Sequence, residues 1–219
     1  DGRQYLYHRT GSAVLTARGP AITTDRGGCA GTGLRPLIAA PATSNGAPAL
    51  VYSVTDGFLP CDQATLVLRP VNGGADVFLA SGVRGAAVAG ANKVVFIRGK
   101  LLFSLELDGF TETQLSATGS DFAGQLVFAS AGTAWTLQPG TGVLTSFDLS
   151  GGPTAGTPLP AVPSLVGAKG GYALAAAELA VEAANGAILK VDTTAGTAST
   201  LLAPATVGAT RLLLGVGNN

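Results

Sequence analysis

Short stretches of alternating apolar and polar residues, separated by glycine turns, recur along the chain and are clearest over residues 85–204. Within one of them, Leu101, Phe103 and Leu105 fall on one side of an extended chain and Ser104 and Glu106 on the other. Side chains alternate between the two faces of a strand, whereas a helix requires apolar residues spaced by three and four. The pattern therefore predicts an all-β protein.

Three stretches share one order of elements, in which three apolar strands are followed by a glycine turn and a fourth, Thr-rich strand. The most helix-like window, 172–184, is rich in alanine, but it lies in register with the repeat and Gly186 follows it as a hairpin turn, which favours strands. The predicted strands are 86–89, 93–97, 101–106 and 110–116, then 126–129, 133–137 and 143–148, then 172–175, 179–182 and 188–192.

A weaker unit covers 35–80, with strands at 49–54, 65–68 and 76–79, and a last unit joins 210–216 to 4–8 and 13–17. The turn glycines of the five units are Gly19, Gly73, Gly109, Gly151 and Gly196, at spacings of 54, 36, 42 and 45 residues. The period also closes across the two termini, so we expect a single β-propeller domain of about five four-stranded blades, closed by the C-terminal strand. The expected blades are 205–219 with 1–34, 35–81, 82–118, 119–160 and 161–204.

The segment 188–197, ILKVDTTAGT, resembles the strand-turn-strand signature of YVTN-type and quinoprotein-like β-propeller repeats. This resemblance implies a propeller fold and carries over no active-site residue. The units lack the Trp that docks between quinoprotein blades and the Trp-Asp ending of WD40 repeats. Two other folds fit the pattern: an open piece of a larger propeller, and a β-sandwich in which the period is coincidental.

Charge is scarce and balanced. Charged residues make up 12% of the chain, against about 25% in a typical soluble domain, and thirteen Lys and Arg balance thirteen Asp and Glu. This balance argues against nucleic acid as a partner, because its binding needs clustered cations. The apolar stretches are too short for a membrane helix, which takes about 20 residues. A low-charge surface favours contact with other protein subunits.

Cys29 and Cys61 are the two cysteines, with no C-x-x-C spacing and no histidine nearby. This favours a disulfide over zinc or redox chemistry and points to an oxidising compartment. Lysine is sparse, and the chain starts at Asp1 and contains no Met. We therefore expect a processed, exported bacterial protein, extracellular or periplasmic; the alternative is that a terminal segment was lost or never identified.

The candidate chemistry is limited. His8 is the single histidine and alternates with aromatic residues on an expected strand, which favours packing or a surface position. Glu106, Asp148 and Asp192 occupy equivalent places and could converge as paired carboxylates, but an acid before a glycine turn usually accepts hydrogen bonds from that turn. The glycines of 25–33 lack the Lys-Ser/Thr ending of a phosphate loop. We predict no catalytic, metal or cofactor residue.

Aromatic residues could line a sugar-binding surface, although core packing is their usual role. The Pro-rich segments 35–48 and 153–163 suit protein contact or serve as connectors. The leading hypothesis is a non-enzymatic binding module or structural subunit. A carbohydrate hydrolase or lyase using rim acids, and a glycan-binding lectin with one pocket per blade, are the alternatives. The aromatic candidates are Phe103, Phe128, Trp135, Phe147 and Tyr172.

Overall fold

The computed structural model describes residues 7–8, 14–16, 22–23, 39–54, 59–60, 62–71 and 74–204. This part of the chain is all-β, as predicted, and its one helical element is a 3₁₀ turn, Pro163–Leu165. No helix within these ranges is long and apolar enough to cross a membrane. The predicted strand at 210–216, the ring closure that depends on it, and the bridge between Cys29 and Cys61 lie outside the described residues.

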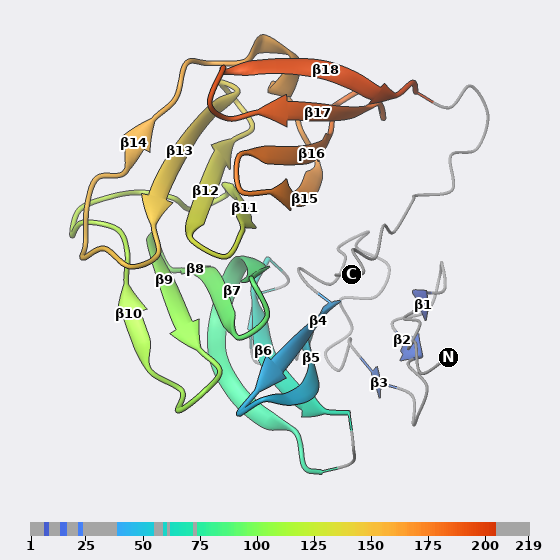
Figure 1. Cartoon of the computed structure of the whole chain (residues 1–219), viewed down its shortest axis with the longest axis vertical. Coiled ribbons are helices and arrows are strands. Elements are labelled where there is room, and N and C mark those ends of the chain that lie inside the picture. Colours follow the sequence, from blue (N-terminus) through green and yellow to red (C-terminus); the bar gives the residue numbers. More distant parts are fainter. Residues whose placement is uncertain are drawn as a thin grey trace.

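The strands within the described ranges form four antiparallel sheets, which Figure 1 shows in chain order. The first sheet contains β1 (Tyr7–His8), β2 (Val14–Thr16) and β3 (Ile22–Thr23). The second contains β4 (Ala39–Ser44), β5 (Ala47–Val54), β6 (Ala64–Pro70), β7 (Val77–Ala89), β8 (Lys93–Arg98), β9 (Leu101–Glu106) and β10 (Glu112–Gln114). The third contains β11 (Leu126–Ala129), β12 (Thr133–Gln138), β13 (Val143–Asp148) and β14 (Thr157–Pro158), and the fourth β15 (Gly170–Ala175), β16 (Glu178–Glu182), β17 (Ile188–Asp192) and β18 (Thr197–Leu202).

The three best repeats have the same internal register, which confirms their predicted equivalence. In each repeat, the last residue of the third strand pairs with the first residue of the second strand. The pairs are Glu106 with Lys93, Asp148 with Thr133, and Asp192 with Glu178. The residue after each acid then donates its backbone N–H to the turn before the second strand. These hydrogen bonds run from Leu107 to Asn92, from Leu149 to Gly132 and from Thr193 to Ala177.

The seam between the second and third predicted units differs from expectation. Separate strands were expected at 76–79 and 86–89, but β7 runs through both without a break. Its first half pairs with β6 and its second half with β8, so that Val83 pairs with both neighbours. Gly82 has a φ of +68°, a conformation that glycine adopts without the usual steric cost. The chain therefore bends inside a strand where a loop was expected, and two four-stranded units share β7.

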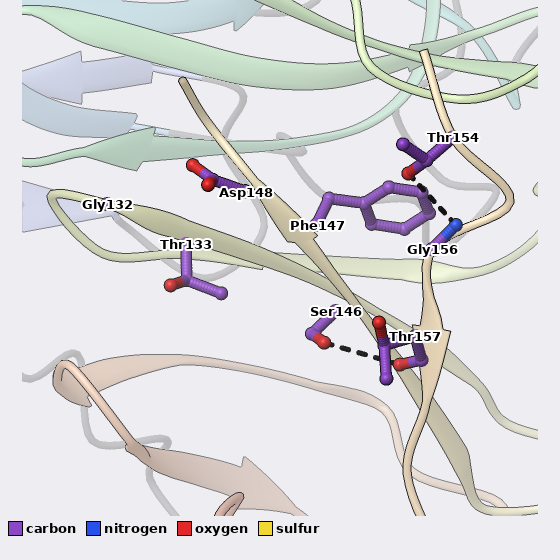
Figure 2. A pocket seen from close by; sticks show the side chains of 8 residues that line it. All are labelled: Gly132, Thr133, Ser146, Phe147, Asp148, Thr154, Gly156 and Thr157. Atoms are coloured by element: carbon purple, nitrogen blue, oxygen red, sulfur yellow. Dashed lines mark hydrogen bonds between the residues drawn. The ribbon is translucent and has the colours of Figure 1, made fainter. Parts of the chain in front are cut away.

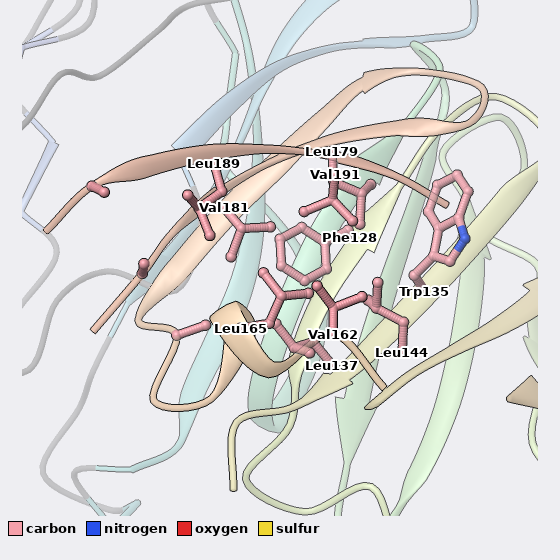
Figure 3. Close-up of a cluster of buried hydrophobic side chains, with 13 residues drawn as sticks. Phe128, Trp135, Leu137, Leu144, Val162, Leu165, Leu179, Val181, Leu189 and Val191 are labelled. Carbon is pink, nitrogen blue, oxygen red and sulfur yellow. The ribbon is translucent and has the colours of Figure 1, made fainter. Parts of the chain in front are cut away.

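Strands in the middle of these units are buried on both faces, because each unit packs against the next. In β8, Val94 and Phe96 belong to one core while Val95 and Ile97 belong to another, and all four are fully buried. A third core fills the space between β11–β14 and β15–β18, where Phe128 lies among Leu137, Leu165 and Val181 (Figure 3). The cores therefore follow one another along the chain, with a sheet between each pair.

The first strands of successive units lie next to each other. β4 contacts β7, β7 contacts β11, and β11 contacts β15, whereas β10, β14 and β18 are the last strands of their sheets. In Figure 1, β4, β7, β11 and β15 lie toward the middle of the molecule, and β10, β14 and β18 lie toward its periphery. We call β4, the 85–89 part of β7, β11 and β15 the inner strands. Sheets packed face to face around common inner strands form a propeller-like arrangement.

The described part of the Pro-rich segment 35–48, from residue 39 onward, is strand and turn and not the plain connector that its composition also allowed. Residues 39–44 form β4, and Asn45 and Gly46, with φ angles of +50° and +72°, make the hairpin turn into β5. Asn-Gly is a favoured pair for such turns. The other Pro-rich segment, 153–163, contributes β14 and then leads into the 3₁₀ turn.

Candidate functional site

The predicted acids lie at equivalent strand ends, on the turns that lead into the outermost strands. We call these turns, with Glu106, Asp108, Asp148 and Asp192, the acid-bearing rim. Each acid ends a strand or follows it closely because the apolar alternation stops there and a glycine turn begins. The rim is the part of the described structure where titratable groups recur in register.

Asp148 accepts hydrogen bonds at Oδ1 from the backbone N–H of Ser150, at 2.8 Å, and from its hydroxyl, at 2.7 Å. The Ser150 hydroxyl and then its N–H lower the pKa of the Asp148 carboxyl, and the charge of Lys93 lowers it further. Asp192 makes similar turn contacts: it accepts the N–H groups of Thr194 and Ala195 at 2.8 and 2.9 Å. These are the turn contacts expected of an acid before a glycine turn.

Glu106 makes a different contact. Its carboxylate lies 2.7 Å from Nζ of Lys93, its cross-strand neighbour. The same ammonium group donates to the carbonyl of Leu149, 3.5 Å away in the next unit. The structure thus brings Glu106 and the Asp148 turn to one lysine, while Asp192 remains on its own turn. Sequence reasoning did not single out Lys93, whose position gains meaning only when two units pack together.

Asp108 is a fourth acid on this rim that sequence reasoning passed over. The side chain of Asn92 donates to it at 3.1 Å, and the backbone N–H of Asn45 also donates to it. The Asn92 amide and then the Asn45 N–H lower the pKa of the Asp108 carboxyl. The Asn45–Gly46 and Asp108–Gly109 dipeptides were the available signals, since both are typical of turns.

A shallow hollow of about 510 Å³ lies beside Asp148, between β13 and the segment that forms β14 (Figure 2). Its hydroxyl groups are partly engaged: Ser146 donates to the Thr157 carbonyl at 3.3 Å, and Thr154 accepts the Gly156 N–H at 3.1 Å. A Cβ atom at Gly156 would lie 2.5 Å from Cγ2 of Thr145, so glycine allows the close approach of this segment. The lining residues are Gly132, Thr133, Ser146, Phe147, Asp148, Thr154, Gly156 and Thr157.

The remaining candidates do not contribute to the rim contacts, although Phe147 also lines the hollow beside Asp148. Trp135, Phe128 and Phe147 are buried in the cores between sheets, and Phe103 stacks on Phe96 with the Arg98 guanidinium 4.5 Å from its ring centre. Within the described ranges, no group of three or more His, Cys, Asp or Glu side chains could hold a metal ion.

Two further candidates, Tyr172 and His8, lie on an inner strand and on the N-terminal sheet. Tyr172 is half-buried on β15, and burial raises the pKa of its phenol. His8 lies on β1, within a strand predicted from the sequence.

Comparison with known proteins supports the fold. The sequence matches no family model and no curated protein. Among solved structures, TolB from Acinetobacter baumannii, a β-propeller protein, aligns over 91% of this chain and 52% of its own, with a TM-score of 0.54 and 12% identity. The chain therefore spans about half the length of the TolB structure.

Two more distant matches are AztD from Citrobacter koseri and BamB from Moraxella catarrhalis. AztD aligns over 94% of this chain and 60% of its own, with a TM-score of 0.44 and 12% identity. BamB aligns over 72% and 47%, with a TM-score of 0.40 and 17% identity. At the level of the fold, the TolB match agrees with the propeller-like packing of the sheets.

Proposed function

We propose that this chain is a non-enzymatic, exported, propeller-type module that binds other protein subunits and acts as a rigid part of an assembly. The observation that carries the proposal is the chemistry of the inner strands. β4, residues 85–89 of β7, β11 and β15 contain no charged residue. Acid–base catalysis needs titratable groups that converge on a pocket, and the centre of the described sheets does not supply them.

The rim acids support the same reading. Asp148 and Asp192 hold their own turns, Asp108 accepts two amide groups, and Glu106 pairs with Lys93. Each contact orders a turn or joins neighbouring units, which is a structural role. Charged residues make up only 12% of the chain, and the centre of protein interfaces is likewise depleted in charge. Balanced charge supports protein over nucleic acid as the partner.

Export rests on the sequence. The Cys29–Cys61 pair and the scarcity of lysine support an extracellular or periplasmic location. Mass spectrometry of the non-reduced protein tests this directly. We expect a mass two hydrogens below that of the reduced chain, and a free thiol at both cysteines would contradict it.

The functional test uses the full chain, tagged and cross-linked in its native host, followed by size-exclusion chromatography with light scattering. We expect a complex of defined stoichiometry. The triple variant Glu106→Gln, Asp148→Asn, Asp192→Asn should retain that complex, because these acids order turns or join neighbouring units. A strictly monomeric particle with no co-purifying partner would overturn the proposal. So would a polysaccharide-cleaving activity that the triple variant loses, or specific binding on a glycan array.

A further inference from the structure

Strand β18 is the outer edge of the last four-stranded sheet, and its exposure sets it apart. Among the described residues, β17 is its one strand partner. Five of its six residues are exposed, and Leu201 and Leu202 expose 47% and 45% of their surfaces. An edge strand presents unpaired N–H and C=O groups along its free side, which is a template for another strand.

The other outer strands carry the features that protect an edge. β14 has only two residues, one of them Pro158, and proline removes a backbone donor. β10 has three residues, and its Glu112 pairs with Arg98 at 2.5 Å. Short length, proline and charge are the usual defences against edge-to-edge pairing. β18 has six residues and neither proline nor charge, and so lacks all three.

From this contrast we infer that β18 pairs antiparallel with β18 of a second copy of the chain, so that two four-stranded sheets join into one across a two-fold axis. The inference names one partner of the proposed assembly module and so rests on that proposed function. The partner is a second copy because the edge is compatible with itself. Its sequence, TASTLL, is neutral throughout, and a two-fold interface applies the same patch to both copies.

Charges next to the edge also permit self-pairing. Lys190, the cross-strand neighbour of Ser199, forms an ion pair with Glu178 at 2.7 Å. Asp192 lies beside Thr197, at one end of β18. Antiparallel pairing sends the two Asp192 carboxylates to opposite ends of the joined edge, roughly 17 Å apart along the strand direction alone for six residues. No like charges meet, whereas like-charge juxtaposition is a common barrier to association.

The contact is small. One strand edge and two leucines per copy fall short of the roughly 1,000 Å² expected of a stable interface. We therefore expect a weak, concentration-dependent equilibrium between monomer and dimer.

Sedimentation velocity on the full chain over a wide concentration series tests the inference. We expect the wild type to move from monomer to dimer, and Leu201→Lys to raise the dissociation constant by about tenfold or more, because an edge lysine blocks pairing. The control is Thr113→Lys, which adds the same charge at an exposed position on β10, and it should dimerise like the wild type. Circular dichroism confirms that both variants are folded.

Hydrogen exchange on the wild type gives a readout that needs no variant. Amides of residues 197–202 should become more protected as concentration rises, and those of β10 should not. A wild type that stays monomeric, a dimer that Leu201→Lys leaves intact, or added protection elsewhere would overturn the inference. If Leu201→Lys is monomeric but still recovers its other partner in the cross-linking experiment, the proposed function stands apart from the dimer.

Discussion

Replacing Val94 and Val95 by alanine, one at a time, probes the two faces of β8. The two residues are adjacent and fully buried, yet Val94 lies in the core shared with β5 and β6, and Val95 in the core shared with β11 and β12. In a sheet with one solvent face, one of two neighbours would be exposed. In packed blades, both must be buried.

The expected cost follows from burial. Each methylene-sized group removed from a core costs about 0.8 kcal/mol, and Val→Ala removes two. The cavity left by incomplete collapse adds about 1 kcal/mol. We therefore expect each variant to lose about 2–3 kcal/mol of unfolding free energy, a large share of the roughly 5–15 kcal/mol typical of a domain.

Urea denaturation followed by fluorescence of Trp135, the single tryptophan, measures this loss. Trp135 is 2% exposed and belongs to a different core from either valine, so its signal reports global unfolding. Val166→Ala is the matched control, because Val166 is 47% exposed and should cost within about 0.5 kcal/mol. If either core variant matches Val166→Ala, β8 has a solvent face and the blade packing is wrong.

Three further outcomes are expected. Asp148→Asn should lower the free energy of unfolding at neutral pH, because a carboxyl whose pKa is depressed in the folded state stabilises the fold above its unfolded pKa. The difference in stability between wild type and variant should vanish as pH falls through the lowered pKa. Urea titrations from pH 7 down to about 2, below the usual aspartate pKa, check this, and a difference that stays constant with pH would contradict it. Gly142→Ala should destabilise the protein more than Gly99→Ala. Both glycines have φ above +60°, but only at Gly142 would an added Cβ atom lie 2.5 Å from a backbone carbonyl oxygen. Equal melting temperatures of the two variants would refute the clash. Glu106→Gln should cost at most about 1 kcal/mol because its partnership with Lys93 is partly exposed, and a larger loss in urea melts would show a stronger link between units.

Much of the regular sheet structure could be predicted because its signals are local. The alternation along 101–106, 143–148 and 188–192 identified β9, β13 and β17 with their bounds, since period two is imposed by strand geometry itself. The alanine-rich window from Tyr172 was correctly interpreted as strands because the repeat overrode its helical composition. Equivalent acids also fell at equivalent ladder positions.

Other features depend on contacts between distant segments. Nothing local distinguishes a glycine that ends a strand from Gly82, which bends one, so the continuity of β7 was missed. The Asn45–Gly46 dipeptide in the sequence is a hairpin signal, but the prolines around it led us to interpret the whole segment as Pro-rich. Lys93 could not be singled out, because its contacts with Glu106 and Leu149 span two units. The closure of the ring and the disulfide stay predictions.

The shared strand β7 has a consequence for how this architecture can change. Where units are joined by loops, one can be gained or lost by a single duplication or deletion, and neighbours keep their own hydrogen bonds. At β7 no such cut exists, because removing either unit would strip half of a ladder from the other. We therefore expect the stretch from β4 to β10 to be inherited, and to open, as one block.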